Sequence, residues 1–134
     1  MKNYPPEKYP DKDDFYNKLK LASIVELEVA KKEDKTKVAG IFLKRLEINM
    51  RLESDATLKY ELGRQAYRKE LLTDMSPYNS YKHKGLPPTP VSNPSKETFD
   101  AVVNAEITGD LFFFTYKGGT YYSKTHDEHL RKRK

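Results

Sequence analysis

Residues 111–124 read LFFFTYKGGTYYSK and decide the fold class. Aromatic and β-branched residues fill 111–116 and 120–124, and the three residues between them, 117–119, form a glycine turn that is typical of a β-hairpin. These are the clearest strands of the chain, and they come after a series of helical patterns. The sequence therefore predicts an α+β fold, in which N-terminal helices pack on a small antiparallel sheet with a C-terminal β-hairpin.

Upstream of the hairpin, the spacing of apolar residues predicts several helices. The predicted elements, in chain order, are a helix over 15–32, a second over 36–49, a short helix between a cap at Ser54 or Asp55 and Gly63, another short helix over 64–75, and a helix from Asn93 to about Thr108. The first helix has apolar residues on two sides and should be largely buried. Residues 76–94, which are rich in proline and tyrosine, have no regular period and indicate a structured functional loop.

Length and composition indicate one folded domain. The chain has 134 residues, of which 37% are hydrophobic and 34% charged, and it has no cysteine, so disulfides and thiol chemistry are excluded. We expect a flexible arm over 1–14, a folded domain over 15–129 and a basic tail over 130–134. The net charge of +5 comes partly from this tail, and acids and bases are otherwise interspersed. No nucleic-acid partner is therefore expected.

Two carboxylates, Glu26 and Glu28, lie in the predicted buried helix. At about 100° per residue they point roughly 200° apart, so both cannot face one cleft. Burial raises the pKa of a glutamate, and a proton held near neutral pH suits a general acid, although a shift of two units costs about 2.7 kcal/mol. The helix pattern leaves a second interpretation open, which is a salt bridge to a cation at the positions Lys20, Lys31, Lys32 or Arg45.

Several segments together resemble the MltG (YceG-like) family of endolytic murein transglycosylases, over about residues 21–129. Residues 22–28 (ASIVELE) are similar to the family's ASIVEKE helix, and 38–46 (VAGIFLKRL) to its VAxVFxNRL helix. Residues 52–60 resemble LQSDPTxxY, and 76–94 resemble SPYNTYxxxGLPPTPISNP. The closing strands and the terminal Glu128-His129 pair continue the resemblance. The sequence departs from the family pattern at four positions: Lys44, Glu53, Ala56 and Thr120.

The resemblance implies a function and a set of site residues. Glu28 corresponds to the family's catalytic glutamate, with Glu26 as the alternative. Protonated Glu28 would donate to the oxygen between N-acetylmuramic acid and N-acetylglucosamine, and would then take the proton of the muramyl 6-hydroxyl, so that a 1,6-anhydro ring forms. The expected substrate-binding residues, with Asp55, Thr57 and Asn79 as hydrogen-bond partners and the tyrosines as stacking surfaces, are Glu53, Ser54, Asp55, Thr57, Tyr60, Tyr78, Asn79 and Tyr81.

The resemblance also implies partners and a location. The expected partner is the peptidoglycan glycan strand, with peptidoglycan synthases as further candidates, at the outer face of the cytoplasmic membrane. The family's N-terminal membrane anchor is absent from these residues, so we expect a soluble chain that is either a short form or an excised piece. No cofactor is expected. His126 and His129 are three residues apart and could in principle share a metal, but no acidic cluster accompanies them, so no metal site is expected. The alternative function is a peptidoglycan-binding domain without turnover.

Overall fold

The computed structural model describes residues 12–133, and its α+β architecture agrees with the predicted class. The elements are α1 (Lys12–Glu28), α2 (Lys32–Glu47), α3 (Asp55–Leu62), α4 (Arg68–Thr73), α5 (Lys96–Val103), β1 (Phe112–Tyr116), β2 (Gly119–Ser123) and α6 (His126–Arg133). Helix α1 begins three residues before the predicted start at Phe15. The first eleven residues of the predicted arm lie outside the described residues.

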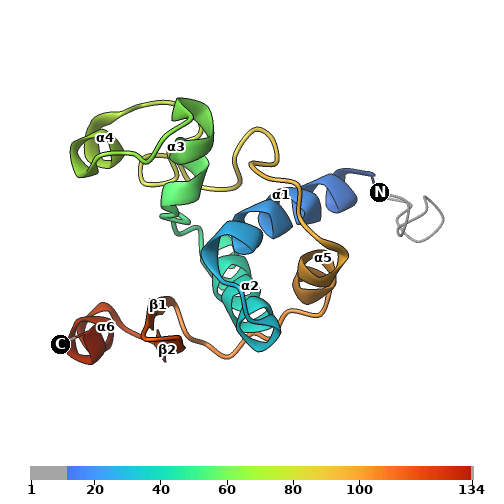
Figure 1. Cartoon of the computed structure of the whole chain (residues 1–134), viewed down its shortest axis with the longest axis vertical. Helices are drawn as coiled ribbons and strands as arrows, with labels where there is room; N and C mark the ends of the chain where they lie inside the picture. Colours follow the sequence, from blue (N-terminus) through green and yellow to red (C-terminus); the bar gives the residue numbers. More distant parts are fainter. Residues whose placement is uncertain (1–11, 134) are drawn as a thin grey trace.

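The core lies where α1, α2 and α5 pack together (Figure 1). Ile24 of α1, Phe42 of α2 and Phe99 of α5 are almost completely buried in it. Gly40 lets the chain approach α2 closely, because a Cβ atom at this position would collide with the carbonyl group of Glu106. The three helices therefore form the packed core that supports the remaining elements.

Helix α3 has the ends that the sequence predicts. The Ser54 side chain caps it by accepting the N–H of Ala56, and Gly63 ends it with a left-handed φ of 72°. The next two helices are shorter than predicted. Helix α4 covers only 68–73 of the predicted 64–75, and α5 begins after Ser95, whose hydroxyl accepts the N–H of Thr98, rather than at Asn93.

Among the described residues, β1 and β2 of the hairpin form the only sheet. Its strands pair antiparallel, with Phe112 opposite Ser123 and Tyr116 opposite Gly119. Lys117 and Gly118 both have positive φ, of 49° and 79°, as a two-residue type I′ turn requires. Strand β2 therefore starts at Gly119, one residue before the predicted strand.

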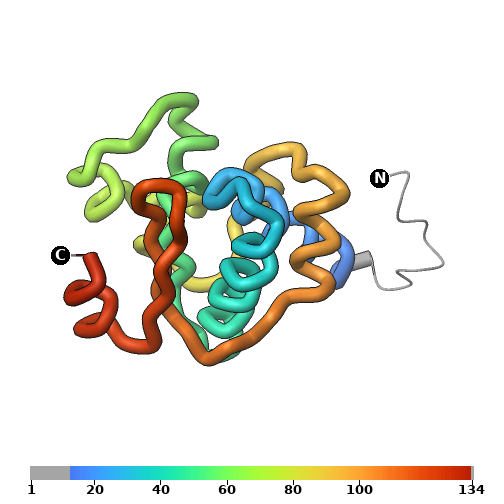
Figure 2. Tube along the Cα trace, turned by 60° about the horizontal axis from the view of Figure 1, so that its bottom comes forward, coloured from blue at the N-terminus to red at the C-terminus, as the bar shows by residue number. Residues whose placement is uncertain are grey.

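In both views the hairpin and α6 lie at the lower left of the molecule, and α3 and α4 lie above them at the upper left (Figures 1 and 2). Helix α6, which occupies 130–133 of the predicted basic tail, packs on both strands of the hairpin, and none of its side chains is fully buried. Phe113 joins the hairpin to the core by an edge-on contact with Phe42. Among residues 12–133, no helix has the length and apolar character needed to span a membrane.

Candidate active site

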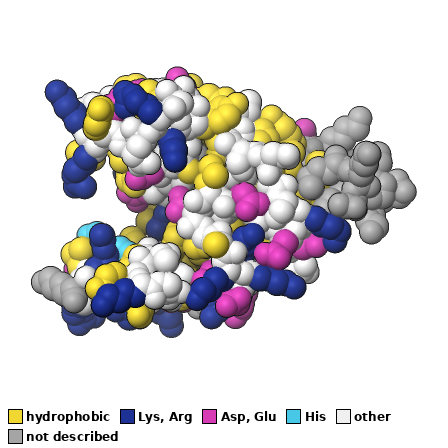
Figure 3. Space-filling view, in the orientation of Figure 1, with side chains coloured by type: hydrophobic (Ala, Val, Ile, Leu, Met, Phe, Trp, Pro, Cys, Tyr) yellow, Lys and Arg dark blue, Asp and Glu magenta, His cyan; other side chains and the backbone are white. Residues whose placement is uncertain are grey.

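An open cleft separates the α3–α4 side of the molecule from the hairpin and α6, and Figure 3 shows it in the molecular surface. Its volume is about 1180 Å³. The lining residues are Leu27, Glu28, Phe42, Arg45, Met50, Glu53, Asp55, Ala56, Lys59, Tyr60, Gly63, Gln65, Arg68, Tyr81, Val91, 112–115, His126, His129 and Arg133. The cleft therefore brings together parts of the chain that are about a hundred residues apart.

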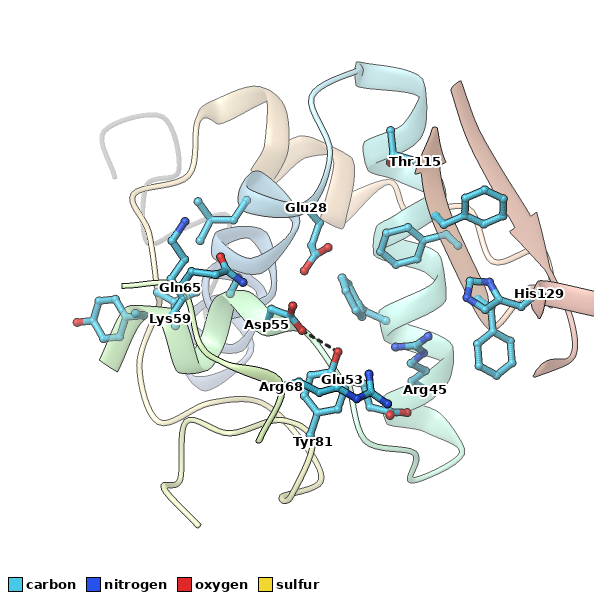
Figure 4. A pocket seen from close by; sticks show the side chains of 18 of the residues that line it. Glu28, Arg45, Glu53, Asp55, Lys59, Gln65, Arg68, Tyr81, Thr115 and His129 are labelled. Atoms are coloured by element: carbon cyan, nitrogen blue, oxygen red, sulfur yellow. Dashed lines mark hydrogen bonds between the residues drawn. The ribbon is translucent and has the colours of Figure 1, made fainter. Parts of the chain in front are cut away.

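Glu28 is the last residue of α1, and its side chain points into this cleft (Figure 4). The Ser54 hydroxyl donates a hydrogen bond to Glu28 Oε1 at 2.5 Å. Burial raises the pKa of Glu28; the Ser54 hydrogen bond and the charge of Arg45 oppose this rise, and the negative charge of Asp55 adds to it. Within residues 12–133 no lysine or arginine forms an ion pair with Glu28, so the predicted alternative of a salt bridge is not realised.

Ser54 is held in place by its neighbours. Its N–H donates to Ser80 Oγ and its carbonyl accepts from the Ser80 hydroxyl, both at 2.9 Å. Thr57 Oγ1 lies 3.0 Å from both the Ser54 carbonyl and Ser80 Oγ. Thr57 is 0% exposed, and its hydroxyl is used inside the protein. Thr57 supports Ser54 from beneath the cleft and does not line it, so its predicted sugar contact stays a prediction.

Arg45 of α2 is a buried cation beside the carboxylates of the cleft. It is 6% exposed, donates from Nη2 to the Leu111 carbonyl at 2.7 Å, and donates from Nη1 to the Leu52 carbonyl. These bonds join α2 to the start of the hairpin and to the segment before α3. The sequence interpretation treated Arg45 only as a salt-bridge partner, although a charge within the apolar pattern of α2 was a signal of a buried role.

Asp55 and Tyr81 form the second polar pair of the cleft, on the α3 side of Glu28 (Figure 4). The Tyr81 hydroxyl donates to Asp55 Oδ1 at 2.7 Å. Burial and this hydrogen bond raise the pKa of Tyr81 well above its usual value, so the phenol stays protonated and continues to donate. Glu53 also lines the cleft and has a left-handed φ of 55°.

Of the two remaining predicted tyrosines, Tyr60 and Tyr78, one lines the cleft and the other lies outside its lining. Tyr60 is 50% exposed and lines the cleft, whereas Tyr78 does not line it. The Tyr78 ring meets the Tyr60 ring at a tilt, with 5.5 Å between the centroids, and its hydroxyl is hydrogen-bonded to Thr89. Asn79 is 0% exposed, and its Nδ2 donates to the carbonyls of Leu71 and Asp74 at 3.0 and 2.7 Å. The amide of Asn79 organises the loop and does not line the cleft, so its predicted sugar contact stays a prediction.

Glu26 does not line the cleft. It accepts hydrogen bonds from the N–H of Ser95 at 2.7 Å and from the Thr98 hydroxyl at 3.0 Å, and it lies 3.7 Å from Lys35 Nζ. Burial alone would raise the pKa of Glu26, but these hydrogen bonds and the charge of Lys35 lower it overall. The two glutamates thus face different parts of the protein, and Glu26 fastens the start of α5.

His126 and His129 line the hairpin side of the cleft with their rings 6.4 Å apart. Among residues 12–133, no three histidine, cysteine or acidic side chains form a group that could hold a metal ion. The sequence interpretation considered the two histidines only as metal ligands, and it missed their place in the cleft wall together with Phe112 and Phe114.

These features define a class of protein, which is a small α+β domain with one partly buried carboxylic acid at the floor of an open cleft. The comparison with protein families extends over nearly the whole chain, because the model of the YceG-like family matches residues 3–134. The chain therefore belongs to the YceG-like family.

Individual relatives agree with this assignment. The chain is 34% identical over 133 residues to an endolytic murein transglycosylase of Bacillus subtilis (strain 168), and 35% identical over 122 residues to one of Streptococcus pneumoniae. These alignments cover 96% and 84% of this chain, but only 37% and 22% of the relatives. A crystal structure of a YceG-like protein from Listeria monocytogenes superposes with a TM-score of 0.86 at 36% identity, over 98% of this chain and 44% of that one.

Proposed function

We propose that this domain is an endolytic lytic transglycosylase that cleaves the bond between N-acetylmuramic acid and N-acetylglucosamine in peptidoglycan strands, with Glu28 as its catalytic residue. The names of the relatives support the activity. This chain matches only 37% and 22% of their length, but the matched part contains the whole cleft. The single observation that carries the assignment of Glu28 is its carboxyl group, which has a raised pKa and lies at the floor of the cleft without an ion-pair partner among the described residues.

The hydrogen bond from Ser54 gives the two oxygens of Glu28 different roles. Ser54 Oγ donates to Oε1, so the acidic proton of Glu28 resides on Oε2. From Oε2 the proton passes to the glycosidic oxygen as the bond between the two sugars breaks. The resulting carboxylate accepts the proton of the muramyl 6-hydroxyl, which attacks the anomeric carbon and closes the 1,6-anhydro ring.

This reaction needs a single acid–base group, because the nucleophile belongs to the substrate. Asp55, the carboxylate whose charge acts on Glu28, is engaged by Tyr81. Its negative charge adds to the rise in the pKa of Glu28 and so favours the protonated form. Glu53, Asp55, Tyr60 and Tyr81 line the cleft and are the proposed contacts for sugar hydroxyl, acetamido and ring groups, whereas Ser54 acts through Glu28.

Digestion of purified peptidoglycan tests the activity and the residue together. Mass spectrometry of the products should detect anhydromuramyl ends with the native chain and none with Glu28→Gln, which preserves the shape of the side chain. Glu26→Gln is the matched control, because it lies on the same helix outside the cleft and should keep the folded protein active. Anhydromuramyl ends produced equally by Glu28→Gln would reject Glu28 as the acid.

The second candidate is a peptidoglycan-binding domain without turnover, and the digestion assay separates it by the absence of anhydromuramyl ends despite binding. We further propose that the protein works on the outer face of the cytoplasmic membrane, close to the synthases that make its substrate. Cross-linking of the protein in cells, followed by identification of the captured partners, tests this location.

A further inference from the structure

The hairpin side of the cleft carries a cluster of aromatic rings, which we call the aromatic wall: Phe112, Phe114, His126 and His129. The Phe112 ring lies 5.7 Å from the His126 ring and 5.4 Å from the His129 ring, measured between centroids. Phe114 meets His129 edge-on at 5.7 Å. All four residues line the same cleft as Glu28, on the other side from α3 (Figure 4).

Strand alternation explains why two phenylalanines lie here. Successive side chains of β1 point to opposite faces, so Phe113 reaches the core beside Phe42, and Phe112 and Phe114 point the other way. Helix α6 packs over this second face, yet Phe112 and Phe114 stay partly exposed in the cleft. Apolar rings left open in a cleft indicate a surface that contacts a ligand.

The polar groups of the aromatic wall are neutral or cationic. Burial, together with the charges of Arg133, His126 and Arg45, lowers the pKa of His129, so this imidazole is uncharged at neutral pH. Within the part of the chain that the structure describes, His129 Nδ1 is shielded from water and has no hydrogen-bond partner. The carboxylates of the cleft come from α1, from the segment before α3 and from the first residue of α3 rather than from this wall; they are Glu28, Glu53 and Asp55.

We propose that the aromatic wall is a saccharide-binding subsite, which holds one pyranose ring of the glycan across the cleft from Tyr60. The C–H face of a pyranose packs on the rings, and its hydroxyl groups exchange hydrogen bonds with the exposed imidazole of His126. This inference rests on the proposed function, because it takes the glycan strand as the ligand. It adds a second binding surface to the residues around α3, which are the only ones that the family motifs indicated.

Binding to an inactive protein tests the subsite without requiring turnover. The full chain carrying Glu28→Gln is titrated with an octasaccharide of alternating N-acetylglucosamine and N-acetylmuramic acid, and the dissociation constant is measured by calorimetry. His126→Ala and Phe114→Ala should each weaken binding by about three- to tenfold, the loss expected for one ring contact. His126 is exposed, so its replacement should leave the fold intact if Phe114→Ala disturbs the hairpin.

Two matched controls lie next to these positions. Tyr116 is on the same face of β1 as Phe114, and Leu130 is on α6 with His126; both are exposed and neither lines the cleft. Tyr116→Ala and Leu130→Ala should bind like the parent protein. The inference is overturned if His126→Ala binds as tightly as the controls, whether or not the native chain is active. Weaker binding by His126→Ala together with an absence of anhydromuramyl products from the native chain would support the subsite and reject the proposed turnover.

Discussion

The Ser54 hydroxyl lies 2.5 Å from Glu28 Oε1, and this one contact joins a helix N-terminus to the proposed catalytic acid. Ser54 also caps α3 by accepting the N–H of Ala56. Because Ser54 Oγ accepts from this backbone group, its own proton is directed to Glu28. The capping geometry of α3 therefore orients the Glu28 carboxyl group, although the two residues are 26 positions apart.

Replacing Ser54 by alanine should change the pH dependence of the reaction. The Ser54 hydrogen bond stabilises the charged form of Glu28, so its loss raises the pKa of Glu28 further. The acid then stays protonated to higher pH, so the alkaline limb of the pH–rate profile shifts to higher pH. The value of kcat falls because the carboxyl group is less well oriented. The profile of kcat against pH measures both effects, and Ser54→Thr, which keeps a hydroxyl, should restore them in part.

Ser54→Ala also removes a helix cap, which costs about 1 kcal/mol of stability. Ser95→Ala is the control for this loss, because Ser95 caps α5 in the same way and lies outside the cleft. A similar decrease in stability with an unchanged pH profile is expected for Ser95→Ala. An identical shift of the profile in both variants would show that the effect comes from general destabilisation.

Glu28→Gln should stabilise the protein, and more so at high pH. The folded-state pKa of Glu28 is raised above its usual value of 4.5, so the native state favours the protonated form. This favourable contribution is complete below pH 4.5 and is lost as the pH rises through the raised folded pKa. Glutamine does not titrate, so its advantage in free energy of unfolding should grow across this window, as urea titrations at several pH values would measure.

Glu26→Gln should show the opposite sign. The folded pKa of Glu26 is lowered, so its contribution to stability is present above pH 4.5 and is lost as the pH falls through the lower folded value. The glutamine variant should therefore be less stable than the native chain at neutral pH and approach it in acid. Equal pH dependence of the two variants would contradict the different environments of the two glutamates.

Local features of the sequence predicted the parts of the structure that depend on neighbouring residues. The cap at Ser54, the end of α3 at Gly63 and the opposite directions of Glu26 and Glu28 all follow from helix geometry over a few positions. Helix α6 was missed because it has no buried side chain, and thus no apolar stripe to detect. Its position depends on contacts of His126 and His129 with the Phe112 ring. These contacts exist only in the folded hairpin and leave no pattern in the sequence of α6.

Contacts that leave no trace in the local pattern account for the roles that the sequence did not predict. Asn79 and Thr57 lie in motifs with polar side chains, which is also what a sugar-binding surface would contain. The structure instead uses both to satisfy buried polar groups of the protein. Arg45 was not assigned to the site because its partner, the carbonyl of Leu111, lies 66 positions away and leaves no trace in the local pattern.

Asn79→Ala should destabilise the loop between α4 and α5. Its amide donates to the carbonyls of Leu71 and Asp74 in a fully buried position, and alanine would leave these carbonyls without that partner. We expect a loss of about 2–3 kcal/mol in the free energy of unfolding, measured by urea denaturation. Tyr60→Ala is the contrasting variant, since Tyr60 is half-exposed in the cleft and should affect KM more than stability.

Gly40→Ala should destabilise the support behind the cleft. The new methyl group would collide with the carbonyl of Glu106, a backbone group that is fixed because its N–H donates to the Thr36 carbonyl at 3.1 Å. The segment after α5 must then move away from α2, at a cost of about 1–3 kcal/mol in the free energy of unfolding. In a helix interior alanine is normally more stable than glycine. A stabilising effect of Gly40→Ala in urea denaturation would therefore contradict the close approach of the two segments.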